Sequence, residues 1–171
     1  MKLLAFDTSN QALSLAILED EHLLAQTTLN IKKNHSITLM PAIDFLMNSL
    51  DMKPTDLDRI VVAQGPGSYT GLRIAVATAK TLAHTLKIEL VGVSSLLALV
   101  PEQVEGLVIP IMDARRNNVY AGFYQSGQAV RPEAHLPLAE VMEIAGAADQ
   151  PVTFVGETAT FAEQIKDALP Q

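Results

Sequence analysis

The strongest constraint on the fold is a β-branched run that ends in a glycine-rich turn and continues into a long amphipathic segment. Residues 59–63 (RIVVA) predict a buried strand, and the turn at residues 65–71 (GPGSYTG) ends it. A helix is expected from Thr70 to about Lys87, and residues 90–93 predict another buried strand. Strand, turn, helix and strand in this order are typical of an α/β layer.

An antiparallel meander is predicted at the start of the chain. Residues 3–7 and 12–18 are apolar runs separated by a polar turn, which indicates a hairpin. A third strand is expected near residues 22–29, after a charged turn. Because the meander precedes an alternation of strands and helices, the two segments together predict a mixed sheet.

A helix is expected over residues 39–50, between the meander and the first α/β strand. Thr38 is its expected cap, and Pro41 falls in its first turn, where backbone donors lack helical partners. The apolar residues of its predicted core face are Leu39, Met40, Ile43, Leu46, Met47 and Leu50.

The pattern restarts in the second half of the chain. Residues 107–112 form an apolar run that ends in Asp113, just as the first run ends in Asp7, and this weak repeat indicates a duplicated unit. The elements expected after it are a strand at 118–124, a helix at 137–145, a strand at 152–155 and a helix at 159–169. We therefore predict two α/β lobes, over residues 1–100 and 107–171, with mixed sheets flanked by helices.

Composition narrows the function classes. The formal net charge is −7, and affinity for phosphate backbones comes mainly from clustered Lys and Arg, so the chain is not expected to grip nucleic acid by itself. Cysteine is absent, which excludes disulfides and thiolate metal sites and fits a reducing compartment. No apolar stretch is long enough for a membrane span, and Asp7 interrupts the first apolar run, so a cytoplasmic location is expected.

Four segments resemble the TsaB (YeaZ) family in the same order along the chain. They are residues 6–9 (FDTS), 65–73 (GPGSYTGLR), 91–96 (VGVSSL) and 112–116 (MDARR). The resemblance implies the actin-like fold of the ASKHA group, in which two duplicated, ribonuclease H-like lobes carry mixed sheets flanked by helices. Chains of this family usually run longer, so the second lobe is expected to be incomplete where the sequence stops at Gln171.

The resemblance also implies a function in tRNA modification. The family's members pair with the paralogous TsaD, which transfers the threonylcarbamoyl group that makes N6-threonylcarbamoyladenosine at position 37 of tRNAs, and with the ATPase TsaE. We therefore expect a partner subunit that binds TsaD, forms a homodimer when TsaD is missing, and reaches tRNA only indirectly.

The histidines argue against catalysis by this chain. The resemblance implies that TsaD holds a metal with two histidines four residues apart, and the corresponding positions here are Ser95 and Leu99. Histidines 22, 35, 84 and 135 include no pair at a spacing suited to one metal. Asp7, His35 and Ser68 are too scattered to predict a proteolytic triad. No catalytic residue and no metal site are therefore expected, which makes the chain a pseudo-enzyme.

Asp7, Thr8 and Ser9 lie where actin-like proteins hold phosphate and Mg²⁺, and Asp113 has the equivalent position in the second lobe. An Asx or ST turn between two strands is the structural alternative. No cofactor is expected, although weak binding of ATP or ADP with Mg²⁺ stays open. The rival function is an ATP-dependent kinase or ATPase using Asp7, Thr8, Asp113 and a loop at residues 156–158, where one glycine stands in place of several.

The glycine-rich turn carries Gly65, Gly67 and Gly71. It lacks the Lys followed by Ser or Thr of a Walker loop, and it is not a Rossmann fingerprint. Its glycines are expected to let the backbone turn sharply and the next helix pack close to the sheet. A contact with a protein partner and anion binding at the helix start are the alternatives.

The helix after this turn has three faces at helical spacing. Its expected core face consists of Gly71, Leu72, Ala75, Val76, Ala79, Leu82, Ala83 and Leu86. Its charged stripe consists of Arg73, Lys80, His84 and Lys87. Its third face is an arc of small, half-apolar residues, Thr70, Ile74, Ala77, Thr78, Thr81 and Thr85. We expect this arc, with Pro41 and Phe45 of the preceding helix, to contact a partner helix; a neighbouring helix of the same chain is the alternative.

Overall fold

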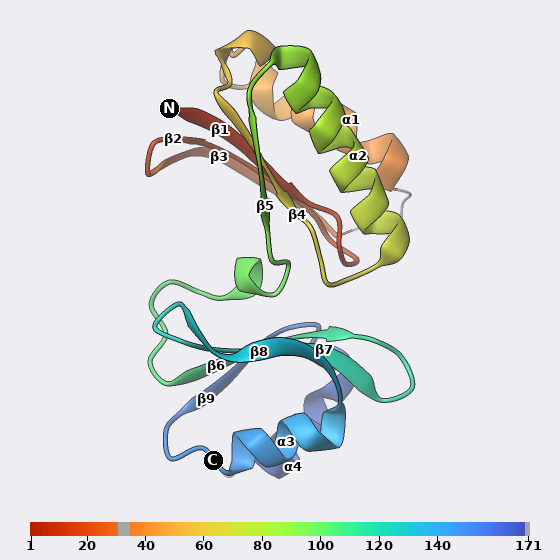
Figure 1. The fold of residues 1–171 in the computed structure, drawn as a ribbon, viewed down its shortest axis with the longest axis vertical. Helices are drawn as coiled ribbons and strands as arrows, with labels where there is room; N and C mark the ends of the chain where they lie inside the picture. Colours follow the sequence, from red (N-terminus) through yellow and green to blue (C-terminus); the bar gives the residue numbers. More distant parts are fainter. Residues whose placement is uncertain (31–34, 170–171) are drawn as a thin grey trace. The chain divides into compact units, whose positions relative to one another are not determined.

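The computed structural model describes residues 1–30 and 35–169 and divides the chain into two compact units, Met1–Ser95 and Leu96–Gln171 (Figure 1). The first unit contains a five-stranded sheet in the order β3-β2-β1-β4-β5. Its strands are β1 (Lys2–Asp7), β2 (Leu13–Glu19), β3 (His22–Leu29), β4 (Arg59–Ala63) and β5 (Glu89–Val93). Since β1 pairs antiparallel with β2 and parallel with β4, the sheet is mixed, as predicted.

Two helices, α1 (His35–Asn48) and α2 (Tyr69–Leu86), cover one face of this sheet (Figure 1). Every second strand residue points toward them, which is the period of a pleated strand with one buried face. The strand residues buried in this layer are Leu4, Phe6, Leu13, Leu15, Ile17, Ile60 and Val62. From α2 the buried residues are all small, namely Gly71, Ala75, Ala79 and Ala83. A helix with small residues at four-residue spacing can lie close to the sheet, so the larger Leu72 and Val76 are only partly buried.

Helix α1 differs from the prediction at its start. It already includes His35, so Thr38 lies inside it and Pro41 falls within the helix rather than in its first turn. Proline lacks the N–H that would reach the carbonyl of Ile37, but Ile37 is exposed, so water can satisfy that carbonyl. Met40 was wrongly assigned to the core: it is 47 % exposed, and Ala42 is buried instead.

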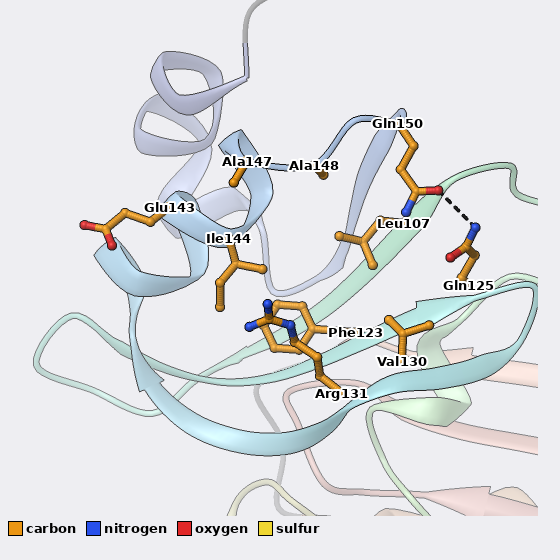
Figure 2. A pocket seen from close by; sticks show the side chains of 10 residues that line it. All are labelled: Leu107, Phe123, Gln125, Val130, Arg131, Glu143, Ile144, Ala147, Ala148 and Gln150. Carbon is orange, nitrogen blue, oxygen red and sulfur yellow. Dashed lines mark hydrogen bonds between the residues drawn. The ribbon is translucent and has the colours of Figure 1, made fainter.

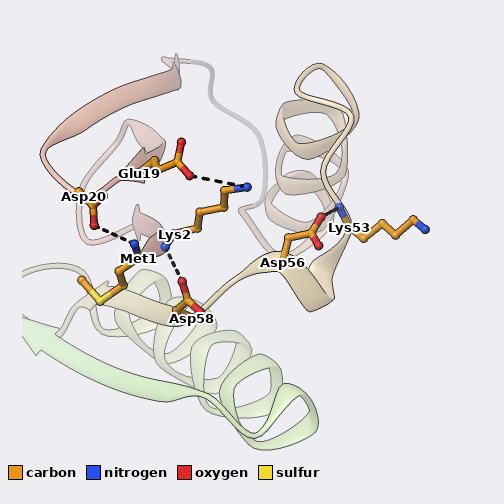
Figure 3. Close-up of polar contacts among 7 residues, drawn as sticks. All are labelled: Met1, Lys2, Glu19, Asp20, Lys53, Asp56 and Asp58. Carbon is orange, nitrogen blue, oxygen red and sulfur yellow. Dashed lines mark hydrogen bonds and ion pairs between the residues drawn. The ribbon is translucent and has the colours of Figure 1, made fainter.

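Charged contacts fix the start of β1 (Figure 3). The amine of Met1 lies 2.7 Å from Asp20 Oδ1, and the backbone N–H of Lys2 donates to Asp58 Oδ2 at 2.6 Å. The hydrogen bond with Asp20 raises the pKa of the Met1 amine, and the same contact lowers the pKa of the Asp20 carboxyl. Because these groups are exposed to solvent, the pair contributes little to stability.

The second unit contains a four-stranded sheet in the order β8-β7-β6-β9, with β6 antiparallel to β7 and parallel to β9. Its strands are β6 (Leu107–Asp113), β7 (Asn118–Gln125), β8 (Gln128–Pro137) and β9 (Val152–Gly156). Its helices are α3 (Leu138–Gly146) and α4 (Ala162–Ala168), and short 3₁₀ turns lie at Pro54–Asp56, Leu97–Leu99 and Ala159–Phe161. The core consists of inward residues of β6 and β7, such as Ile109 and Phe123, packed against Leu138 and Val141 of α3.

The two sheets share one topology, because β8-β7-β6-β9 repeats the order β3-β2-β1-β4, and α3 follows β8 as α1 follows β3. In the first unit β5 pairs with the outer side of β4. Within the described part of the chain, no strand pairs with the outer side of β9, the equivalent of β4.

Strand β8 was not predicted. It lies at the edge of its sheet, most of its residues are exposed, and it contains Pro132, so it lacks the alternation of apolar and polar residues that marks a half-buried strand. It is held by backbone pairing with β7 and by a hydrogen bond from the Tyr124 hydroxyl to the Glu133 carboxylate.

Candidate interaction surface and glycine-rich junction

The turn after β1 packs against the start of α2. Thr8 and Ser9 are buried, the Thr8 hydroxyl donates to the carbonyl of Gly71 at 2.7 Å, and the N–H of Ser68 donates to the carbonyl of Ser9 at 2.6 Å. Ser68 is the N-cap of α2, and its Oγ accepts from the N–H of Gly71 at 3.4 Å. The junction therefore joins two segments that are about sixty residues apart in the sequence.

The predicted glycines lie at this junction. A Cβ added at Gly71 would stand 1.9 Å from the Thr8 carbonyl oxygen, and one at Gly67 would stand 2.4 Å from that of Ser9. Gly65 has a φ of +120°, which side chains rarely adopt. Its N–H donates to Ser95 Oγ at 3.1 Å, which ties the turn to the end of β5. Gly67 and Gly71 thus have a packing reason in the fold and Gly65 has a conformational one, and a contact with a partner or an anion stays a prediction.

The two predicted phosphate turns share one hydrogen bond in the two units. Asp7 Oδ1 accepts from the N–H of Ser9, and Asp113 Oδ1 accepts from the N–H of Arg115, each at 2.7 Å. This is the Asx turn named above as the structural alternative. The buried Ser9 Oγ has no hydrogen-bond partner in the described residues. A role in phosphate binding stays a prediction.

Helix α1 carries an exposed apolar stripe opposite its core face. Ile37 is 66 % exposed, Phe45 is 67 % exposed, and Met40 and Pro41 are also exposed. Asp44 and Asn48 are exposed on the same side, but exposed apolar groups that gather on one side of a helix indicate a contact surface. The sequence prediction named Pro41 and Phe45. It missed Ile37, because it started the helix too late, and Met40, because it assigned that residue to the core face.

The small-residue arc of α2 is divided by the structure. Thr70, Ala77, Thr81 and Thr85 are exposed, whereas Ile74 and Thr78 are half-buried. Ile74 packs against the core of the first unit, so part of the arc is covered by the chain itself. The sequence prediction also missed Tyr69, which is 78 % exposed at the start of α2.

These exposed residues belong to one helical layer, because α1 and α2 contact each other on the same face of the sheet (Figure 1). We use the name helical-layer surface for the following exposed residues of this layer, chosen for their apolar or small side chains: Ile37, Met40, Pro41, Phe45, Tyr69, Thr70, Ala77, Thr81 and Thr85. Exposed charged residues of the same helices, such as Asp44 and Arg73, are not included. The side chains of the helical-layer surface are apolar or small, which suits packing against a helix more than chemistry. Within the described residues, no three His, Asp or Glu side chains are placed to hold a metal ion.

The fold defines the class of protein. Two α/β units with the same strand order and flanking helices form an actin-like fold of the ASKHA type. A profile of the family described as "TsaD: tRNA N6-adenosine threonylcarbamoyltransferase" matches residues 22–169. A solved structure described as "YeaZ from Pseudomonas aeruginosa" is 34 % identical, with a TM-score of 0.72 over 80 % of this chain and 66 % of that chain.

The curated relatives identify the particular family. The tRNA threonylcarbamoyladenosine biosynthesis protein TsaB of Bacillus subtilis is 46 % identical over 99 % of this chain and 77 % of its own length. The protein of the same description from Escherichia coli is 30 % identical over 73 % of this chain and 55 % of its own length. The chain therefore belongs to the TsaB family, whose role is in tRNA threonylcarbamoyladenosine biosynthesis. It spans about three quarters of the B. subtilis protein and about half of the E. coli protein.

A second P. aeruginosa structure, also 34 % identical, is described as an uncharacterized protein with similarity to peptidase YeaZ. Asp7, His35 and Ser68, which are too scattered in the sequence to predict a proteolytic triad, each have another hydrogen-bond partner in the described residues. Ser68 Oγ accepts from Gly71, Asp7 accepts from Ser9, and His35 Nε2 lies 3.0 Å from the carbonyl of Asn10. Among the described helices, none is long and apolar enough to cross a membrane.

Proposed function

We propose that the chain is a non-catalytic partner subunit that binds the TsaD transferase and supports formation of N6-threonylcarbamoyladenosine at position 37 of tRNAs. The observation that carries this proposal is the helical-layer surface in a chain of the TsaB family. Helix α1, with its exposed apolar stripe, contacts α2, which carries exposed small residues, so a partner helix that packs on this layer can cover Phe45 and Ile37.

The energetics favour such a contact. Burying a side chain such as Phe, Ile or Met contributes roughly 1.5–3 kcal/mol. Three of the exposed side chains on α1 are of this size. The threonines and Ala77 on α2 lose little rotamer entropy when they are covered, so this entropy loss offsets little of the free energy gained by burying the apolar side chains of α1. The same surface can pair with a second copy of the chain when TsaD is missing, which gives a homodimer.

The chain itself supplies no transferase or protease site on this proposal. Ser95 and Leu99 stand where the paralogue is expected to have metal-binding histidines, and Leu99 cannot bind a metal. The net charge of −7 supports a contact with tRNA through the partner. The ATPase TsaE joins the complex, and the assembly works in the cytoplasm.

The rival function, an ATP-dependent kinase or ATPase, has less support. Its proposed nucleotide loop is closed onto β6: the N–H of Glu157 donates to the carbonyl of Ile111 at 3.0 Å, and Glu157 Oε2 accepts from the N–H of Asp113 at 2.7 Å. The backbone of Gly156 leaves no room for a larger residue, since an added Cβ would lie 2.4 Å from the Ile111 oxygen. The N–H of Glu157, the N–H of Asp113 and the Glu157 carboxylate are thus already hydrogen-bonded within the chain.

The proposal is tested by co-purification with the cognate TsaD. Phe45→Glu and Thr81→Glu place a charge on the helical-layer surface, where burying it unpaired costs several kcal/mol. Ile74→Glu and Thr78→Glu would also weaken the interface. Because these positions are half-buried, the same variants would also destabilise the fold, so a loss of binding could not be assigned to the interface alone. We expect Phe45→Glu to abolish recovery of TsaD and to leave thermal melting of the isolated chain unchanged.

Leu23→Glu is the matched control. Leu23 is 51 % exposed on β3, so the variant introduces the same charge at an exposed apolar residue of the same unit. It should bind TsaD like the wild type. Equal recovery of TsaD with Phe45→Glu, Thr81→Glu and Leu23→Glu would show that the interface lies elsewhere.

A further inference from the structure

A groove of about 500 Å³ opens in the second unit, between β7, β8 and the end of α3 (Figure 2). Leu107 and Phe123 form its floor and are almost fully buried, while Val130 and Ile144 are partly exposed along its sides. The volume lies in the range of pockets that bind small molecules, and the lining combines six apolar residues with four polar or charged ones.

The internal repeat explains why this space is open. In the first unit, the segment between α1 and β4 runs from Ser49 to Asp58 and buries Met52 and Leu57 in the core. In the second unit, the equivalent segment between α3 and β9 covers only residues 147–151. It brings Ala147 and Ala148 to the groove, and these side chains are too small to fill it.

One guanidinium group stands in the groove. The Arg131 guanidinium carbon lies 5.9 Å from the centre of the Phe123 ring, a cation–π arrangement that holds the side chain over the apolar floor. Within the described residues, no carboxylate forms an ion pair with Arg131. Glu143 lines the rim, but its carboxylate points away from Arg131 (Figure 2).

A pair of amides borders the other end of the groove. Gln125 Nε2 donates to Gln150 Oε1 at 3.0 Å, which links the end of β7 to the segment before β9 (Figure 2). This bond uses the oxygen of Gln150, so its NH₂ group remains as a donor. Arg131 and Gln150 thus both offer N–H groups to a ligand, and the walls between them are apolar.

We propose that this groove binds a small aromatic carboxylate. The carboxylate accepts from the Arg131 guanidinium, whose planar fork suits two parallel hydrogen bonds, and the aromatic body lies on Val130 and Ile144. Charge complementarity favours a carboxylate ligand. Although the protein as a whole is negative, the groove contains a guanidinium group that forms no ion pair with a carboxylate of the described residues. This site is separate from the helical-layer surface and independent of the function proposed above.

Indole-3-acetate is a suitable probe, with the uncharged indole-3-acetamide as its matched analogue. Because the chain has no tryptophan, indole fluorescence and its anisotropy report on the ligand alone. We expect saturable binding of the acid, at least about tenfold weaker binding of the amide, and an equally large loss with Arg131→Ala. Arg131→Lys should recover only part of the affinity, because an ammonium cannot form the bidentate pair.

Two further variants separate this site from unspecific binding. Arg73→Ala removes an exposed arginine from α2 and should bind the acid like the wild type. Ala148→Leu fills the groove and should weaken both probes, and melting curves of every variant check the fold. Absence of saturable binding, equal affinity for acid and amide, or equal losses with Arg131→Ala and Arg73→Ala would overturn the proposal.

Discussion

Replacing Gly71 with alanine tests whether helix propensity or tertiary packing determines stability at this position, because the two predict changes in stability of opposite sign. On helix propensity alone, alanine would stabilise α2 by up to about 1 kcal/mol, because glycine is a poor helix former. The tertiary structure predicts the opposite. The new Cβ would stand 1.9 Å from the Thr8 carbonyl oxygen, closer than any real contact, so α2 and the turn after β1 must move apart.

The magnitude follows from two costs. Forcing extra volume into a packed region costs about 1–3 kcal/mol. Moving the segments apart also stretches the 2.7 Å hydrogen bond from Thr8 to Gly71, and leaving that buried hydroxyl unsatisfied costs about 1–3 kcal/mol. After subtraction of the propensity gain, we expect a net loss of roughly 3 kcal/mol, which lowers the Tm by roughly 6–12 °C for a chain of this length.

The assay is urea unfolding followed by circular dichroism, with Ala77→Gly as the matched control. Ala77 is exposed on the same helix, so this variant reports the intrinsic cost of glycine there, about 1 kcal/mol, without any clash. If Gly71→Ala proves as stable as the wild type or more stable, the close approach of α2 to the Thr8 turn is not what requires glycine, and the reasoning fails.

Three other expectations concern binding and ionisation. Purified protein should contain no stoichiometric zinc or iron, and elemental analysis that finds one tightly bound transition metal would contradict the pseudo-enzyme proposal. The chain alone should show negligible affinity for tRNA in a gel shift at physiological salt, because it is acidic; submicromolar binding would be incompatible with an indirect contact. Asp20→Asn should lower the pKa of the Met1 amine, measured by NMR titration, since the hydrogen bond with Asp20 raises it. In the wild type the stabilisation from this amine is present below its ordinary pKa and is lost as the pH rises through the raised value.

Several parts of the fold followed from the sequence because their signals are local. The apolar runs of β1 and β2, with a polar turn between them, predicted a hairpin, and the bounds of β4 were predicted at Arg59–Ala63, as observed. The core face of α2 was also predicted, since Gly71, Ala75, Ala79 and Ala83 are all buried. In each case the signal lies within one short stretch of sequence, so it can be recognised without knowing which residues pack against it.

Other features were decided only by tertiary contacts. Strand β8 exists because β7 offers a row of backbone partners, and an exposed edge strand needs no apolar alternation of its own. Proline occurs both in the first turn of a helix and, less often, within one, so Pro41 did not fix where α1 begins. The structure shows that α1 begins before Pro41 and that Met40 is exposed to solvent. The sequence predicted a glycine-rich turn, but the carbonyl oxygens that exclude side chains at Gly67 and Gly71 belong to Ser9 and Thr8, far away along the chain. Contacts of this kind depend on how the sheet and helices pack, and no local pattern records them.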